Sequence, residues 1–261
     1  MSLRIPDIQA KKTRAEKITM LTAYEAWMAR LLEASGMVDM LLVGDSLGMV
    51  ELGYGTTIPV TMNDMVRHTR AVRAGAPDAL IVADMPFLSH QLSVSQALRN
   101  AGRLMQHGAA TAVKMEGGAS AVEAVARIAS AGIPVMGHLG LQPQSVHAQG
   151  GFRKQAKQPE EQSRLMSDAV ALESAGVFAI VLECVPPTLA CVVTRRLRVP
   201  VIGIGSGPDC DGQVLVTHDI LGLSGDAAPS FARQYADLGQ AIVNAVKAFS
   251  EDVRAGRYPD A

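Results

Sequence analysis

Residues 41–45 read Leu-Leu-Val-Gly-Asp, a short apolar run that ends on a carboxylate. The same pattern returns three times, at 80–84 (LIVAD), 112–116 (AVKME) and 179–183 (AIVLE). A carboxylate is costly to bury alone, so an acid at the tip of a buried strand usually meets a cation, a donor or solvent. The four runs therefore predict strand tips that converge on one charged site, as in a metal-dependent enzyme on a parallel sheet.

Apolar runs of strand length recur through the whole chain. They are found at 18–24, 38–45, 79–84, 110–116, 133–138, 177–183, 199–204 and 214–217. They are continuously apolar rather than alternating, which is typical of strands covered on both faces. Helical spacing with start and stop signals predicts helices between them, at 25–35, 120–130 and 159–175.

This repetition favours an α/β fold, a single (β/α)8 TIM barrel. The 261 residues are close to the roughly 250 of such a barrel, and no linker interrupts the eight units. We therefore expect one domain over 1–261, with a C-terminal helical region at about 229–261. An open doubly wound sheet is the alternative, but the sequence has neither a GxGxxG after its first strand nor a Walker loop. The long connections 46–64 and 139–158 are expected to supply lids and substrate contacts.

The composition excludes several classes of partner. A net charge of −1 gives no basic field for nucleic acid or an anionic membrane, and only 4% of the residues are aromatic. No apolar stretch reaches the roughly 18 residues that cross a bilayer, and the N-terminal residues lack the apolar core of a secretory signal. We therefore expect a cytoplasmic protein without nucleic-acid or membrane partners.

The three cysteines are predicted to be free thiols in a reducing compartment. Cys184, Cys191 and Cys210 are odd in number and have no metal-ligand spacing. Cys184 follows Glu183, but alternation along a strand turns it to the opposite face. It is not predicted to act as a nucleophile.

The candidate site residues stand where barrel strands end, because those ends face the active site. They are Asp45, Ser46, Asp84, Lys114, Glu116, His138 and Glu183. Several carboxylates make a hard oxygen site that suits Mg²⁺. Zinc is disfavoured, because His138 alone lies among the acids and no cysteine joins it.

Each of these residues also has a plain structural explanation. A strand-end Asp can cap the next helix, and Lys114 and Glu116 can form an ion pair. His138 can be a hydrogen-bonded loop residue, and Glu183 can be the partner of a nearby arginine. Capping alone does not account for acids at four of eight strand tips, so the shared site remains the preferred interpretation.

Seven collinear strings then carry a resemblance over about residues 8 to 250. They are 20–24 (MLTAY), 43–50 (VGDSLGMV), 82–87 (VADMPF), 113–118 (VKMEGG), 135–141 (VMGHLGL), 203–213 (GIGSGPDCDGQ) and 218–223 (HDILGL). In these strings the chain closely resembles the ketopantoate hydroxymethyltransferase (3-methyl-2-oxobutanoate hydroxymethyltransferase) family. The resemblance implies a Mg²⁺-dependent barrel, commonly a homodecamer of two pentamers. It also implies one-carbon transfer from 5,10-methylenetetrahydrofolate to 3-methyl-2-oxobutanoate, giving 2-dehydropantoate (ketopantoate), the first committed step of pantothenate synthesis.

The resemblance also assigns roles to residues. It implies that Asp45, Asp84 and Glu116 bind Mg²⁺, directly or through water, and that Glu183 is the catalytic base. The substrate-binding residues that it implies are Asp45, Ser46, Asp84, Lys114 and His138.

Two residues depart from the family pattern, and two other functions stand as alternatives. Ala156 replaces a usual glycine in the loop 151–157, and Glu25 replaces a usual aspartate; both leave loop closure and folate contacts open. A Mg²⁺-dependent carbon–carbon lyase or mutase of the phosphoenolpyruvate mutase/isocitrate lyase type is the alternative enzyme. The chain lacks the Lys-Cys-Gly-His type of lyase loop, and residues 114–118, Lys-Met-Glu-Gly-Gly, favour the transferase. A non-catalytic assembly protein would be expected to have lost part of the acid cluster.

Overall fold

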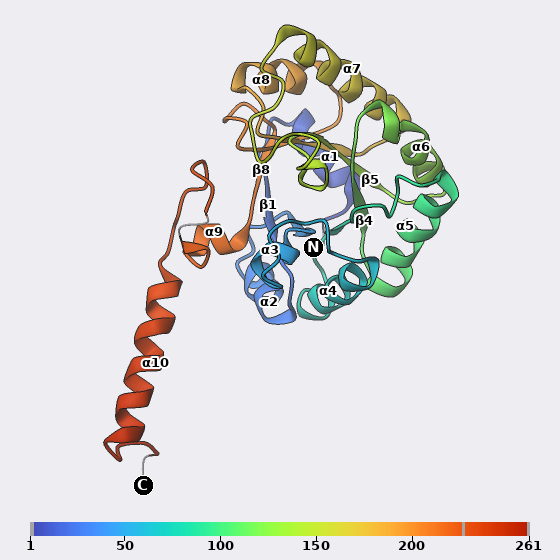
Figure 1. Ribbon diagram of the computed structural model, residues 1–261. Helices are drawn as coiled ribbons and strands as arrows, with labels where there is room; N and C mark the ends of the chain where they lie inside the picture. Colours follow the sequence, from blue (N-terminus) through green and yellow to red (C-terminus); the bar gives the residue numbers. More distant parts are fainter. Residues whose placement is uncertain (1–2, 226–227, 260–261) are drawn as a thin grey trace. The chain divides into compact units, whose positions relative to one another are not determined.

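Eight parallel strands close into a barrel in chain order, from β1 to β8. The computed structural model describes residues 3–225 and 228–259, and Figure 1 shows helices arranged around the strands. The strands are β1 (Ile18–Thr22), β2 (Met40–Val43), β3 (Ile81–Asp84), β4 (Ala112–Glu116), β5 (Val135–Gly140), β6 (Ala179–Glu183), β7 (Val201–Ile204) and β8 (Gly212–Leu215). The predicted (β/α)8 barrel is confirmed.

Helices alternate with the strands, except between β7 and β8, where residues 205–211 form a loop. The helices are α1 (Ile5–Thr13), α2 (Ala26–Ala34), α3 (Leu47–Val50), α4 (Met62–Gly75), α5 (Val94–Gly108), α6 (Val122–Ser130), α7 (Pro159–Ala175), α8 (Pro187–Arg196), α9 (Thr217–Leu221) and α10 (Leu238–Arg254), with 3₁₀ turns η1 (Ala119–Ala121) and η2 (Pro143–Ser145). Among the described residues, no helix is both long and apolar enough to cross a membrane.

Local sequence signals explain where these helices begin and end. In α4, the Thr61 hydroxyl accepts the N–H of Asp64 at 3.2 Å, and the Asp64 carboxylate accepts the N–H of Thr61 at 3.0 Å. This reciprocal pair satisfies N–H groups that the first turn leaves open. α7 begins at Pro159 and stops at Gly176, whose φ is +100°. The bounds 159–175 predicted for this helix are confirmed.

The eighth strand differs from its predicted position. It was expected at 214–217 and lies at Gly212–Leu215. Gly212 pairs with Ile202 in β7, and Thr217 already begins α9. The apolar run therefore includes the entry to a helix, and it is displaced by two residues from the segment that pairs.

By its internal contacts the chain falls into two compact units, Met1–Val214 and Leu215–Ala261. The first unit holds all the strand residues except Leu215 of β8, and the second holds α9 and α10. α10 lies within the helical region predicted at about 229–261, of which residues 260–261 are outside the described residues. Residues 1–2 are also outside the described residues. The single domain over 1–261 stays a prediction.

One apolar cluster draws side chains from all eight strands, so it fills the barrel interior. Its strand residues include Leu42, Val82, Ala112, Met136 and Val181. Successive side chains on a strand point to opposite faces, so the residue two positions further on also points inward. In four of these strands that residue is polar: Asp84, Lys114, His138 and Glu183. The apolar interior therefore gives way to polar groups toward the strand C-termini.

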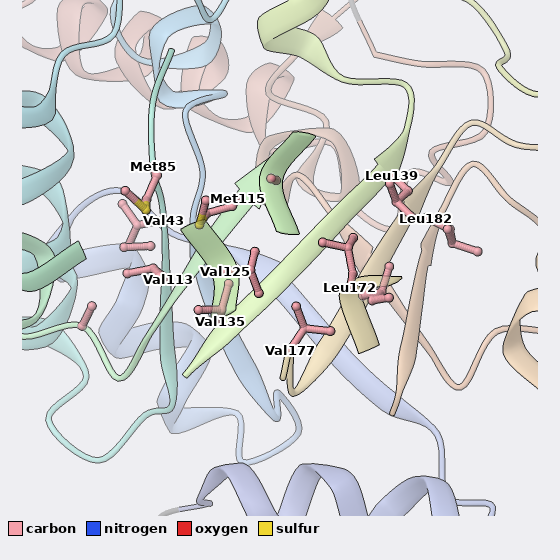
Figure 2. Packing of buried hydrophobic residues seen from close by; sticks show 14 of the residues in the cluster. Val43, Met85, Val113, Met115, Val125, Val135, Leu139, Leu172, Val177 and Leu182 are labelled. Atoms are coloured by element: carbon pink, nitrogen blue, oxygen red, sulfur yellow. The ribbon is translucent and has the colours of Figure 1, made fainter. Parts of the chain in front are cut away.

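The outward strand faces pack under the helices in a second cluster. Figure 2 shows part of this cluster, with Val135 of β5 near Val125 of α6, and Leu172 of α7 near Val177. Val135, Val125 and Leu172 are fully buried. This packing fixes the strands from outside, so their C-terminal ends are held by rigid elements.

Candidate active site

Asp84 and Lys114 face each other at the tips of neighbouring strands. They are partners in the β3–β4 register, and Nζ of Lys114 lies 2.8 Å from Oδ1 of Asp84. The second oxygen of Asp84 accepts the backbone N–H of Asp45 at 3.0 Å. All three residues are buried, so Asp84 connects the end of β2 to the end of β4.

His138 is the centre of the cluster. Its Nδ1 lies 3.2 Å from Nζ of Lys114 and 3.6 Å from Oε1 of Glu116. Its Nε2 lies 3.2 Å from Oε2 of Glu183. The register explains this position. His138 pairs with Glu116 of β4, and Gly140, two residues further along β5, pairs with Glu183 of β6. The imidazole thus stands between two strand-tip carboxylates.

Ser46 lies beside this cluster at the start of α3. Its hydroxyl shares a 2.8 Å hydrogen bond with the hydroxyl of Tyr24, in which either oxygen can donate. A side-chain carbon at Gly44 would lie 2.8 Å from the Ser46 hydroxyl and 3.5 Å from a carboxylate oxygen of Asp84. A side chain at Gly44 would therefore crowd the Ser46 hydroxyl.

Gln144 in η2 contacts two of the carboxylates. It was not predicted from the sequence as a site residue. Its side-chain amide donates to Oδ2 of Asp45 at 2.8 Å and to the carbonyl oxygen of Met85 at 2.9 Å. Its backbone N–H donates to Oε2 of Glu116 at 3.2 Å. The only signal was its place in the connection 139–158, which was expected to make site contacts.

The cations of the cluster stay charged. Burial opposes the charge on Lys114, but Asp84, Glu116 and Asp45 outweigh it and raise the pKa of the ammonium group. Burial and Lys114 likewise oppose a charge on His138, yet the carboxylates of Glu116 and Glu183 raise its pKa to about 9. Neither group is therefore suited to remove a proton near neutral pH.

Burial also raises the pKa of two other ionisable groups. Burial, then repulsion by Asp84 and Glu116, raises the pKa of Asp45 well above its usual value. Burial, followed by the charge of Glu183, raises the pKa of Cys184 to about 11. A protonated thiol is a poor nucleophile, which agrees with the sequence interpretation of Cys184.

The carboxylate set fits a hard divalent cation. Oε1 of Glu116 is buried and has no hydrogen-bond partner among the described residues, although the imidazole of His138 lies 3.6 Å away as an ion-pair partner. Oxygens from Asp45, Asp84 and Glu116 do not all come within 4.8 Å of one another. Mg²⁺ commonly uses one or two direct carboxylates and keeps several waters. This spacing therefore suits a mixed set of direct and water-bridged contacts.

The loop after β5 contains a strained residue at position 156, where alanine replaces the glycine that is usual in the family. Ala156 is buried and has a φ of +53°, a region that costs an L-residue about 1–2 kcal/mol. The neighbouring Gln155 N–H donates to the carbonyl oxygen of Cys184 at 2.9 Å. The loop is therefore fastened beside Glu183 despite the strain at Ala156.

Solved structures with a similar fold include a hydrolase and a lyase. A phosphonopyruvate hydrolase matches with a TM-score of 0.64 at 14% identity, covering 98% of this chain and 90% of that one. A 2,3-dimethylmalate lyase of the phosphoenolpyruvate mutase/isocitrate lyase superfamily matches with a TM-score of 0.60 at 16% identity, covering 100% and 91%. At such identity the likeness shows the fold alone.

Sequence relatives are far more similar. The 3-methyl-2-oxobutanoate hydroxymethyltransferase of Moorella thermoacetica is 56% identical, over 98% of this chain and 95% of that protein. The protein of the same name from Thermosynechococcus vestitus is 51% identical, over 99% and 98%. The model of one family, described as ketopantoate hydroxymethyltransferase, matches residues 2–261. The chain belongs to the ketopantoate hydroxymethyltransferase family.

Proposed function

We propose that this chain transfers a hydroxymethyl group from 5,10-methylenetetrahydrofolate to 3-methyl-2-oxobutanoate and releases 2-dehydropantoate. Family membership supports this reaction. The structural observation that supports it is the solvent exposure of Glu183, the proposed base. The Glu183 side chain is 16% exposed, whereas those of Asp84 and Glu116 are 3% and 4% exposed. Among these three carboxylates Glu183 has the most exposed side chain, and it is the one proposed as the catalytic base.

The proposed metal side consists of Asp45, Asp84 and Glu116, which would hold Mg²⁺ directly or through water. Oε1 of Glu116, which has no hydrogen-bond partner among the described residues, supports this assignment. So do the burial and the charge repulsion that raise the pKa of Asp45. The chemistry that bound Mg²⁺ would supply is polarisation of the 2-oxo group, which acidifies the C3 proton. Ser46 and Lys114 hold the oxo-acid beside these carboxylates.

In the proposed reaction Glu183 removes the proton from C3 of the oxo-acid. The ammonium group of Lys114 stabilises the negative charge that then develops on the oxo oxygen. His138 holds the Glu183 carboxylate in place through its 3.2 Å contact. C3 bonds to the methylene carbon, whose two C–N bonds break and which takes a hydroxyl group from water. The C3 proton and the second water proton end on the two nitrogens of tetrahydrofolate.

We also propose a homo-oligomer, a decamer by family resemblance, in the cytoplasm. Large apolar side chains exposed along α10 support self-association. Three free cysteines, of which two are buried, are in keeping with a reducing compartment.

The test of this function is Glu183→Gln. We expect hydrogen–deuterium exchange at C3, measured by NMR with Mg²⁺ and without folate, to fall about 10²–10⁴-fold. Turnover with folate should fall with it, while binding of Mg²⁺ and oxo-acid is retained. Glu123→Gln, an exposed change on α6, is the control. Near-normal exchange in Glu183→Gln would remove Glu183 as the base.

A further inference from the structure

A cleft of about 610 Å³ is lined by none of the residues to which a role was assigned above. It is bounded by α7, by the loop after β4 and by the loop after β5. Gly117, which lines it, directly follows Glu116, and Gly140, which also lines it, pairs with Glu183. Ligand pockets have volumes of about 300–1,000 Å³. The cleft is therefore large enough for a second substrate, and residues that adjoin Glu116 and Glu183 contribute to its lining.

Asp168 of α7 lies in one wall of the cleft and contacts the loop after β4. Its Oδ1 accepts the N–H of Ala119 at 2.9 Å. Within residues 3–225 and 228–259, its second oxygen has no hydrogen-bond partner. A side-chain carbon at Gly118 would overlap the Asp168 carboxylate. The glycine thus allows the carboxylate to stand against the loop with one oxygen left for a ligand.

The other charged groups of the cleft are not equivalent to Asp168. Glu161 accepts the N–H groups of Lys157 and Gln158 at 2.8 and 3.1 Å, so its Oε2 is committed to the start of α7. Arg164, one turn before Asp168, forms no ion pair or hydrogen bond with the described residues. The cleft therefore combines an acceptor beside Gly118 with an exposed cation.

The free oxygen of Asp168 matches a donor of a reduced pterin. Such a pterin carries a ring N–H and an exocyclic amino group, and a carboxylate oxygen accepts from either donor. We propose that the cleft binds the folate donor, with the free oxygen of Asp168 accepting a hydrogen bond from its pterin. This inference rests on the proposed function, which requires a folate next to Glu183.

The test uses the full-length protein with Asp168→Asn. The amide oxygen can still accept the N–H of Ala119, but the side chain has lost its charge and its second strong acceptor. Loss of a hydrogen bond to a charged group typically costs a factor of about ten or more. We expect the KM for 5,10-methylenetetrahydrofolate to rise by that factor. The KM for the oxo-acid and the folate-free C3 exchange should stay at wild-type values.

Two further variants make the result specific. Glu160→Gln removes an exposed charge from the same helix outside the cleft and should leave both KM values unchanged. Ser120→Trp places a large ring at an exposed position of the cleft wall, and it should reduce donor binding while exchange continues.

The outcomes separate the two proposals. A wild-type protein that exchanges C3 but makes no product from the folate contradicts the proposed function. Normal donor KM in both Asp168→Asn and Ser120→Trp, in a wild type that turns over, overturns the cleft assignment alone. So does an equal loss of folate-free exchange and donor use in both variants, because it assigns Asp168 to the structure of the site.

Discussion

Gln144 joins a loop to the acids of two strands, so its side chain should influence how these acids bind a metal. It donates to Asp45 through its side chain and to Glu116 through its backbone. Partners of metal ligands typically contribute about 10–100-fold to metal affinity. We expect Gln144→Ala to weaken Mg²⁺ binding by such a factor in calorimetric titration. Gln106→Ala, an exposed change on α5, is the control. Equal Mg²⁺ affinity in both variants would contradict the positioning role.

Asp45 should make Mg²⁺ binding depend on pH. Burial and the charges of Asp84 and Glu116 raise its pKa, so the metal-free protein keeps this proton above the usual carboxyl range. Because Mg²⁺ binds the ionised form, the proton must leave first, and affinity should fall as the pH is lowered. Titrations at pH 5 and pH 8 should give the tighter binding at pH 8. Asp45→Asn should flatten this dependence; an equally steep profile in the variant would assign it to another group.

At the residue scale, the sequence predicted the members of the cluster but not its connections. Asp84, Lys114 and Glu116 stand out because a charge ends an apolar run. The central place of His138 depends on the register that sets it opposite Glu116, and a sequence does not show register. Gln144 lies in an irregular loop without periodicity, so nothing in its surroundings marked its contacts.

At the scale of elements, hydrophobic periodicity predicted strands and helices well where one apolar face meets one neighbour. α7 has Pro at its start and Gly at its end, so both bounds were readable. β8 was displaced because the apolar run around Val214 continues into the start of α9. Pairing with β7, which is not local, decides where that strand lies.

The contact between α2 and α4 depends on a glycine that the sequence alone did not single out. A side-chain carbon at Gly75, the last residue of α4, would overlap the backbone of Ala26 at the start of α2. Gly75→Ala should therefore push the helices apart and lower the free energy of unfolding by about 1–3 kcal/mol, as overpacking typically does. Urea denaturation followed by circular dichroism measures the change.

Gly102 of α5 provides a matched comparison. A carbon added there meets nothing within 4 Å, and alanine in a helix interior is about 0.5–1 kcal/mol more favourable than glycine. Gly102→Ala should therefore raise the unfolding free energy in the same assay. A loss of stability in Gly102→Ala similar to that in Gly75→Ala would show that close packing does not explain the effect.

At the scale of the whole molecule, the barrel was predictable because eight βα units without a linker have few ways to bury their strands. The closed order β1 to β8 follows from that count. The arrangement of the residues after β8 does not follow, because residues 216–225 and 228–259 contain no strand that could pair with the barrel. What covers an apolar helix face depends on tertiary or quaternary contacts that periodicity does not specify.

α10 raises this question most directly, since its apolar side chains recur at helical spacing. Ile242, Val246, Phe249 and Val253 are 55%, 58%, 55% and 46% exposed. An amphipathic helix is expected to bury such a face, so we expect a second copy of the chain to cover it.

Light scattering after size exclusion should give the wild type a mass well above the 27.5 kDa monomer. Ile242→Glu combined with Phe249→Glu should lower that mass, because charges in an apolar contact are costly. Asn244→Glu with Lys247→Glu changes charge elsewhere on α10 and should preserve it. A monomeric wild type, or an unchanged mass in the first variant, would show that α10 does not hold the assembly together.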